Sequence, residues 1–228
     1  MKVFSIRKEQ ILAALCILVL IVCVAYTWRQ DSVTAFSMPV SKKIVLIDAG
    51  HGGADPGKVA GSTQEKNLNL AIAQKLQVYL EQGGSTVLMT RADDADLGAS
   101  KKSDMYSRKL TASESRADIF VSIHQNSFTS SSAQGAQVFY FNKSDNSKRL
   151  AECIQAELES FVDQNNTRVA KANDNYYVLK QTAMPAVLVE CGFLSNPAEK
   201  AKLGDDYYQE QIAWGIYMGI VKYFQEGK

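Results

Sequence analysis

Apolar residues recur along this chain in two spacings, which alternate from residue 44 onward. Short, nearly continuous apolar runs occupy residues 44–48, 86–90, 118–124, 137–141 and 186–190. Runs of this length that are rich in Val and Ile predict strands covered on both faces of a sheet. Between the runs, apolar residues three or four positions apart predict amphipathic helices. The residues with this spacing are Leu68, Ile72, Leu76, Tyr79 and Leu80, then Leu150, Cys153, Ile154, Leu158 and Phe161, and last Ile212, Ile216, Met218, Ile220 and Phe224.

Strands that alternate with helices predict a single α/β domain, which we assign to residues 42–228. Residues 30–41 are polar and lack a clear period, so we expect them to be a tether before the domain. Residues 92–107 and 126–135 are rich in Ser, Asp, Ala and Gly, and we expect them to be exposed loops.

The first apolar stretch of the chain is of a different kind. Residues 11–26 are all apolar, and the uncharged stretch has 18 residues, from 11 to 28. As a helix it would be roughly 27 Å long, close to the hydrocarbon thickness of a bilayer. Lys2, Arg7 and Lys8 precede it, so the positive-inside rule places the chain after Arg29 across the membrane. We expect residues 1–29 to be a signal peptide or a signal anchor of an exported domain.

The charge balance argues against one class of partner, and the cysteine content limits the number of disulfides. The chain has 228 residues, with 25 Lys and Arg against 24 Asp and Glu. This balance leaves no basic excess for a polyphosphate, so nucleic acid is not an expected partner. Cys16 and Cys23 lie in the N-terminal segment, so the domain can form at most one disulfide, between Cys153 and Cys191. Two buried free thiols are the simpler interpretation.

The two histidines of the chain each stand at the carboxyl end of a predicted strand. His51 follows the strand at 44–48, and His124 ends the strand at 118–124. Ligands of open α/β sheets bind outside the carboxyl ends of strands, so we expect the two imidazoles to converge. Glu190 ends a third strand, where a buried carboxylate needs a cation or hydrogen-bond donors.

Glu65, which opens the helix after the first strand, has two interpretations. In Ser62-Thr63-Gln64-Glu65 it fits a capping box, in which its carboxylate accepts from the Ser62 backbone N–H. Taken alone, this pattern favours capping. However, the loop at residues 51–57 contains three Gly and one Pro, which permit sharp turns. Such a loop can bring the helix start to face His51, where Glu65 could bind a metal.

Two imidazoles and one carboxylate, with a fourth position for water, are the ligand set of catalytic zinc. A second carboxylate would then carry protons, and Glu190 is available for that role. Two unrelated core histidines fit such long spacings equally well. A cysteine amidase or peptidase built on Cys191 is disfavoured, because Cys191 continues the strand after Glu190 and should point to the opposite face.

Four motifs connect these residues to a known family. They are DAGHGGADPG at 48–57, the helix start EKNLNL at 65–70, SIHQNS at 122–127 and PAVLVECGFLSNP at 185–197. Over about residues 43–226 the chain resembles the zinc-dependent N-acetylmuramoyl-L-alanine amidases of the Amidase_3 type. The resemblance implies a three-layer αβα fold around a central six-stranded, twisted, mostly parallel sheet. It also implies one Zn²⁺ per chain, held by His51, Glu65 and His124, with catalysis by Glu190.

The resemblance also implies the substrate of this hydrolase: the amide between the lactyl group of N-acetylmuramic acid and the first L-Ala of the peptidoglycan stem peptide. Glu190 would take a proton from the attacking water and return it to the leaving amine. Asn126 is a candidate for a hydrogen bond to substrate. Arg91 and Arg108 are expected to be surface or ion-pair residues without a catalytic role.

Gln125 departs from the family pattern, in which many members have Ala, and we expect it to alter the floor of the groove. A bare domain behind one N-terminal segment resembles the germination-specific amidases of the spore cortex, while growth-phase and cell-separation autolysins share this architecture. The expected partners are peptidoglycan, an accessory protein that stabilises zinc binding, and the membrane if the N-terminal segment is not cleaved. The non-enzymatic alternative is a wall-binding or wall-assembly factor with an inactive amidase scaffold.

Overall fold

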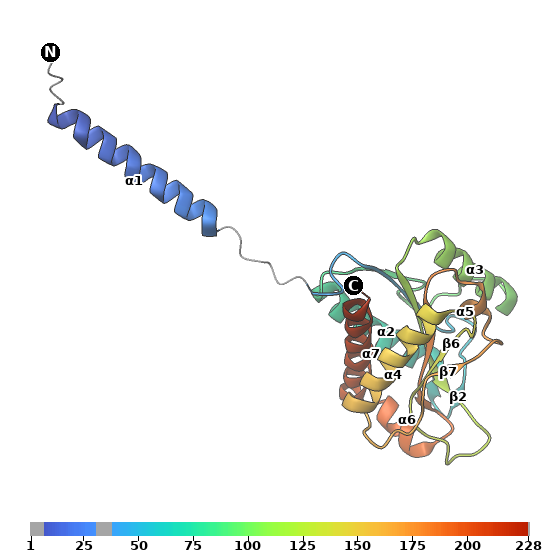
Figure 1. Ribbon diagram of the computed structural model, residues 1–228. Coiled ribbons are helices and arrows are strands. Elements are labelled where there is room, and N and C mark those ends of the chain that lie inside the picture. The colour runs from blue at the N-terminus through green and yellow to red at the C-terminus, as the bar shows by residue number, and fades with distance from the viewer. Residues whose placement is uncertain (1–6, 31–37, 228) are drawn as a thin grey trace. The chain divides into compact units, whose positions relative to one another are not determined.

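The computed structural model of the protein describes residues 7–30 and 38–227. They belong to two units, one up to Ser37 and one from Met38. In the first unit the described residues include the helix α1 (Lys8–Gln30), drawn in Figure 1. Its apolar residues from Ile11 to Val24 are exposed. None of the helices in the described ranges combines the length and the apolar character that crossing a membrane requires. Residues 1–6 of the expected signal segment and residues 31–37 of the expected tether lie outside the described residues.

The second unit alternates strands and helices, and it contains every strand and helix that the hydrophobic pattern predicts. Its elements are β1 (Ile44–Ala49), β2 (Val59–Ala60), β3 (Thr63–Gln64), α2 (Glu65–Gln82), β4 (Thr86–Met89), α3 (Lys101–Glu114), β5 (Ile119–Asn126), β6 (Gln137–Tyr140), α4 (Asp145–Phe161), β7 (Lys171–Ala172), α5 (Tyr177–Gln181), β8 (Ala186–Phe193), α6 (Pro197–Leu203) and α7 (Asp206–Glu226). The predicted α/β class is therefore confirmed.

The central sheet has six strands in the order β4-β1-β5-β8-β6-β7. The first four of these are mutually parallel, whereas β6 pairs with β8 antiparallel. The sheet is thus mixed but mostly parallel, as expected, because β6 with β8 is the one antiparallel pair among its described strands. A separate two-stranded hairpin, β2 with β3, lies between β1 and α2 in the chain.

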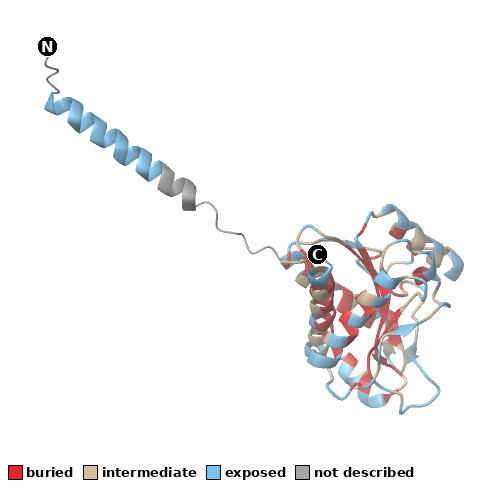
Figure 2. Ribbon diagram, in the orientation of Figure 1, coloured by how far each residue is buried: buried red, intermediate tan, exposed pale blue. Residues whose placement is uncertain are grey.

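Helices cover both faces of the sheet, which gives three layers. On one face α2, α4 and α7 enclose the larger core, which includes Val45 and Ile47 of β1. On the other face α3 and α5 cover a smaller core with Leu46. Successive residues of one strand thus point to opposite faces, as the period of a strand requires. Figure 1 shows helices on both sides of the sheet, and Figure 2 shows that the buried residues gather in the middle of the domain.

Three boundaries differ from the sequence-based expectations. Residues 101–107 were expected in a loop but begin α3, because Ser100 caps this helix in a capping box with Ser103. The helix buries only Arg108 and Ala112, so its sequence shows no apolar period. The folded domain begins before residue 42, since Val40 is fully buried in the larger core. The expected loop at residues 126–135 is confirmed from Ser127 onward.

The strands β5 and β8 both continue past the residues at which they were expected to end. β5 extends two residues beyond His124 and β8 three residues beyond Glu190. His124 and Glu190 are direct register partners on these neighbouring strands, and a register shift follows between His124 and Asn126. The sheet therefore places the imidazole and the carboxylate side by side, on the face that α3 and α5 cover.

Candidate metal centre and active-site cavity

His51 enters the site from a tight loop directly after β1. The preceding Gly50 allows His124 to approach, because a Cβ added at Gly50 would lie 2.2 Å from His124 Nε2. His51 itself has a φ of 61°, which is rare for a residue with a side chain. Its Nδ1 lies 2.8 Å from Asp55 Oδ2 within the same loop. A carboxylate bonded to one imidazole nitrogen fixes the ring and leaves Nε2 to face the site.

Glu65 is the first residue of α2, and its side chain points into the site rather than back along the chain. Its Oε1 lies 3.2 Å from His51 Nε2 and 3.0 Å from His124 Nδ1. The residue before the helix is Gln64, which makes no side-chain cap, while Ser62 lies in the turn between β2 and β3. The capping-box interpretation is therefore wrong, because the β2–β3 hairpin turns the helix start toward the histidines.

The loop after β1, the start of α2 and the end of β5 together bring three donor groups into one cluster. The potential ligand atoms of His51, Glu65 and His124 all lie within 4.8 Å of one another. Among the described residues, this is the group of His, Cys, Asp or Glu side chains that could hold a metal ion. The two imidazole rings meet edge to face, with centroids 5.0 Å apart. Two nitrogens and one carboxylate oxygen facing a common point fit a divalent metal of the zinc class. Their roles as ligands stay a prediction.

The carboxylate of Glu65 is held in its ionised form. Burial works to raise its pKa, but hydrogen bonds and charge from His124 and His51 outweigh burial and lower the pKa far below its ordinary value. Backbone N–H groups add to this: Gln125 donates to Oε1 at 3.1 Å and Lys58 donates to Oε2 at 2.8 Å. An ionised carboxylate is the form that a metal ion requires.

Glu190 lies beside the cluster in a different environment. It is 7% exposed, and its Oε1 accepts a hydrogen bond from the Tyr176 hydroxyl at 3.1 Å. Its Oε2 has no hydrogen-bond partner among the described residues. Burial raises the pKa of the Glu190 carboxyl, against the opposing charge of His124. A buried carboxylate with one free oxygen and a raised pKa is suited to accept and release a proton.

Tyr176 and Asp55 are two members of the site to which the sequence analysis assigned no role. Tyr176 precedes α5 and packs its ring against Phe139, with centroids 5.5 Å apart. Its segment has no periodic pattern, so only the fold brings it to Glu190. Asp55 could have been predicted from the sequence, because it follows His51 by four residues in a Gly-rich loop that can turn its carboxylate toward the imidazole.

A cavity of about 370 Å³ opens over these side chains, and His51, Glu65, His124 and Glu190 all line it. Asn126, the candidate for substrate binding, also lines the cavity, although its Oδ1 accepts from the Ser127 N–H at 2.7 Å. The cavity therefore joins a candidate metal site and a candidate proton carrier in one solvent-accessible space.

Gln125, the departure from the family pattern, borders the same cavity but is largely buried beneath it. Only 3% of the residue is exposed. Its side-chain amide donates to Asn69 at 3.2 Å, and Asn69 in turn donates to the Gly50 carbonyl. Gln125 thus takes part in a buried polar network that supports the loop before His51.

The two arginines are buried, so the interpretation of them as surface residues is wrong. Arg91 and Arg108 are 4% and 2% exposed. Arg91 donates to the backbone carbonyls of Ala49 and Gly50. Arg108 pairs with Asp48 and donates to the His51 carbonyl at 2.8 Å, which agrees with an ion-pair role. Both side chains hold the backbone that carries the first histidine.

Replacing Arg108 with Met is expected to lower the free energy of unfolding by about 3–5 kcal/mol, because it leaves Asp48 buried without its cation. Asp48 is 1% exposed, and although burial works to raise its pKa, the Arg108 charge and a Ser122 hydrogen bond lower it. Urea unfolding of Arg108→Met and of the control Lys102→Met, on the exposed face of the same helix, measures the difference. A loss below about 1 kcal/mol would refute the structural role; adding Asp48→Asn should restore part of the stability.

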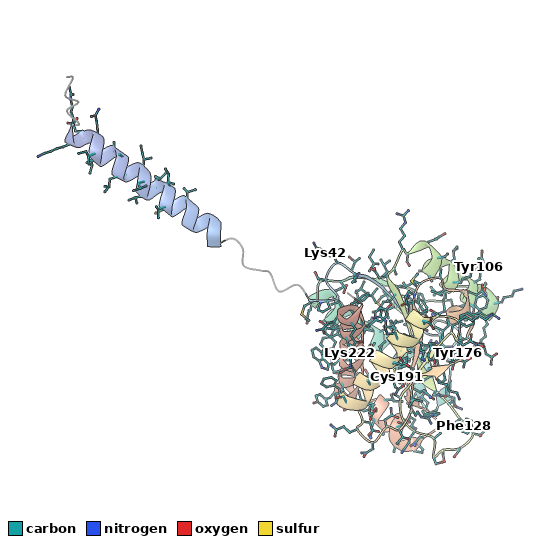
Figure 3. All side chains as sticks on the ribbon, viewed as in Figure 1. Lys42, Tyr106, Phe128, Tyr176, Cys191 and Lys222 are labelled. Atoms are coloured by element: carbon teal, nitrogen blue, oxygen red, sulfur yellow. The ribbon has the colours of Figure 1, made fainter. Side chains whose placement is uncertain are left out.

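Neither Cys153 nor Cys191 lines the active-site cavity. Cys191, which is labelled in Figure 3, is fully buried. It belongs to the core on the opposite face of the sheet from Glu190, as predicted. Burial raises the pKa of its thiol, which keeps it protonated. Cys153 and Cys191 are both free thiols, which agrees with the simpler of the two interpretations.

Comparisons with known proteins agree with this geometry. Residues 45–222 match the family described as N-acetylmuramoyl-L-alanine amidase. A germination-specific N-acetylmuramoyl-L-alanine amidase of Bacillus subtilis (strain 168) is 38% identical over 206 residues, which are 87% of this chain and 86% of that protein. A solved structure of the CwlD amidase from Clostridioides difficile in complex with the GerS lipoprotein is 45% identical, with a TM-score of 0.79 over 81% of this chain and 100% of that one.

A second solved structure, an N-acetylmuramoyl-L-alanine amidase from Clostridium difficile 630, is 35% identical, with a TM-score of 0.75 over 82% of this chain and 100% of that one. The similarity covers the sheet, both helix layers and all four motifs that surround the cavity. The chain belongs to the Amidase_3 family of N-acetylmuramoyl-L-alanine amidases.

Proposed function

We propose that this protein is a zinc-dependent hydrolase that cleaves the amide between the lactyl group of N-acetylmuramic acid and the first L-Ala of the peptidoglycan stem peptide. The observation that carries the proposal is the arrangement in one cavity of His51, Glu65 and His124 facing one another, with Glu190 beside them. The family of the chain supplies the class of bond.

The donor set fits the metal. Two imidazole nitrogens and an ionised carboxylate are a ligand set of catalytic zinc, and His51 has the carboxylate partner, Asp55, that orients such ligands. When bound, zinc supplies the positive charge that acidifies a water molecule and polarises the carbonyl of the scissile amide. His51, Glu65 and His124 would hold it.

The protein's own part in the chemistry is to move a proton. Glu190 Oε2, which has no partner among the described residues, takes the proton of the attacking water. Tyr176 donates to Oε1 and keeps the carboxyl turned toward the cavity. The raised pKa of Glu190 allows it to hold this proton until the amine of L-Ala leaves and receives it. Asn126 at the cavity wall is placed to hydrogen-bond the substrate.

The cellular role and partners follow the same proposal. Relatives from Staphylococcus are named as probable cell wall amidases, and the Bacillus relative is named as germination-specific. We propose export of the domain by residues 1–29, followed by secretion or anchoring, because peptidoglycan lies outside the cytoplasmic membrane. We place its action in the spore cortex. The complex of the CwlD amidase with the GerS lipoprotein supports an accessory protein for this chain as well.

Digestion of purified peptidoglycan tests the proposed bond. The zinc-loaded protein should release new L-Ala amino termini and leave lactyl carboxylates on muramic acid, both detected by end-group labelling and mass spectrometry of muropeptides. New reducing sugar ends would mean a glycosidase instead. New amino termini on any other stem residue would mean a peptidase.

A further inference from the structure

A second cavity, of about 770 Å³, adjoins the active-site cavity. It lies at the first turns of α3 and the start of α5, two helices that contact each other on one face of the sheet (Figure 1). Lys101, Met105 and Tyr177 line both cavities. The two cavities are therefore adjacent, and a long substrate bound at the candidate metal site can reach the second one.

The walls of this second cavity combine aromatic rings with cations. Tyr106 is 55% exposed and Tyr177 is 40% exposed, so both rings offer apolar surface to a ligand. Lys101 and Lys102 are exposed beside them. We name this wall the lysine–tyrosine shelf; it consists of Lys101, Lys102, Met105, Tyr106 and Tyr177.

The two lysines of the shelf are unpaired. Neither lies within 4.0 Å of a carboxylate in the described part of the chain, whereas Lys66 and Lys75 are both paired. Lys101 is close enough to the metal site for its charge to act on Asp55, the carboxylate bonded to His51. Unpaired cations at the edge of an active-site cavity attract anionic groups of a substrate.

We propose that the lysine–tyrosine shelf binds the carboxylate-bearing part of the stem peptide, beyond the L-Ala whose amide is cleaved. This inference rests on the proposed function. Charge indicates which part of the substrate lies on the shelf. The glycan on the lactyl side is uncharged next to the scissile bond, whereas the stem peptide carries free carboxylates. Lys101 and Lys102 pair with these carboxylates, and the two tyrosine rings pack against the peptide.

Two soluble substrates test the shelf, one with free carboxylates beyond L-Ala and one with the same groups converted to primary amides. The measured quantity is the ratio of kcat/KM for the acidic substrate to that for the amidated one, using the zinc-loaded full chain. In Lys101→Met/Lys102→Met this ratio should fall roughly 3- to 10-fold, the range expected for two solvent-exposed charge pairs, mainly through KM. Added salt should reduce the ratio of the unaltered protein in the same direction.

Lys143→Met is the matched control, because Lys143 is exposed and lines neither cavity. Its ratio should equal that of the unaltered protein. The inference is overturned if the double variant keeps the ratio, if Lys143→Met lowers it equally, or if the shelf variants change only the preference for glycan length. If the double variant unfolds, the two single variants give the same comparison. Failure of the unaltered protein to cleave either substrate would instead overturn the proposed function.

Discussion

Glu190→Gln should reduce the rate of peptidoglycan hydrolysis by about 10²- to 10⁴-fold while the zinc content stays near one per chain. The substitution keeps the shape of the side chain and its contact with Tyr176, but the amide cannot accept the proton of water. Because Glu190 lies beside the three predicted ligands and is not one of them, the metal should remain. Steady-state hydrolysis and elemental analysis of the same preparation measure the two quantities.

The matched control for this variant is Glu152→Gln, a carboxylate on the exposed side of α4 whose side chain is 57% exposed. It should hydrolyse peptidoglycan at the rate of the unaltered protein. Nearly full activity of Glu190→Gln would refute the proton-carrier role. Loss of zinc in Glu190→Gln together with its retention in Glu65→Gln would show that the two carboxylates have exchanged roles.

Removal of the metal should abolish hydrolysis altogether. A strong chelator should inactivate the protein, and added zinc should restore its activity, because without the metal neither the water nor the carbonyl is activated. His124→Ala should contain little zinc and should not respond to added zinc, since it leaves only two of the three donor groups. Activity that persists in a rigorously metal-free preparation would refute metal dependence.

The order of strands and helices was predictable, and the exceptions have physical causes. Buried strands such as β5 begin with a run of apolar residues, Ile119, Phe120 and Val121, which cannot be mistaken for a polar loop. α3 was missed because it buries an arginine, Arg108, where a pattern search expects an apolar residue. The end of β8 was placed too early because Cys191, Gly192 and Phe193 continue the strand beyond a carboxylate that normally marks a solvent-exposed end.

In the site, too, some residues could be predicted from their own segment, whereas others are placed only by the tertiary structure. His51 and His124 were expected to converge because each follows or ends a strand, and the register of the sheet brings them together. Glu65 illustrates the opposite case: its local sequence fits a capping box, but the β2–β3 hairpin redirects its side chain toward the histidines. Tyr176 could not be found at all, because no pattern in its own segment relates it to Glu190.

The most direct test of the proposed metal centre is X-ray diffraction at the zinc absorption edge from crystals of the active, zinc-loaded protein. We expect one anomalous peak in the active-site cavity, within bonding distance of nitrogens of His51 and His124 and of the Glu65 carboxylate. Glu190 should lie close by without being a ligand. A zinc ion bound by Glu190 in place of Glu65, or no peak at these residues, would contradict the proposed metal centre.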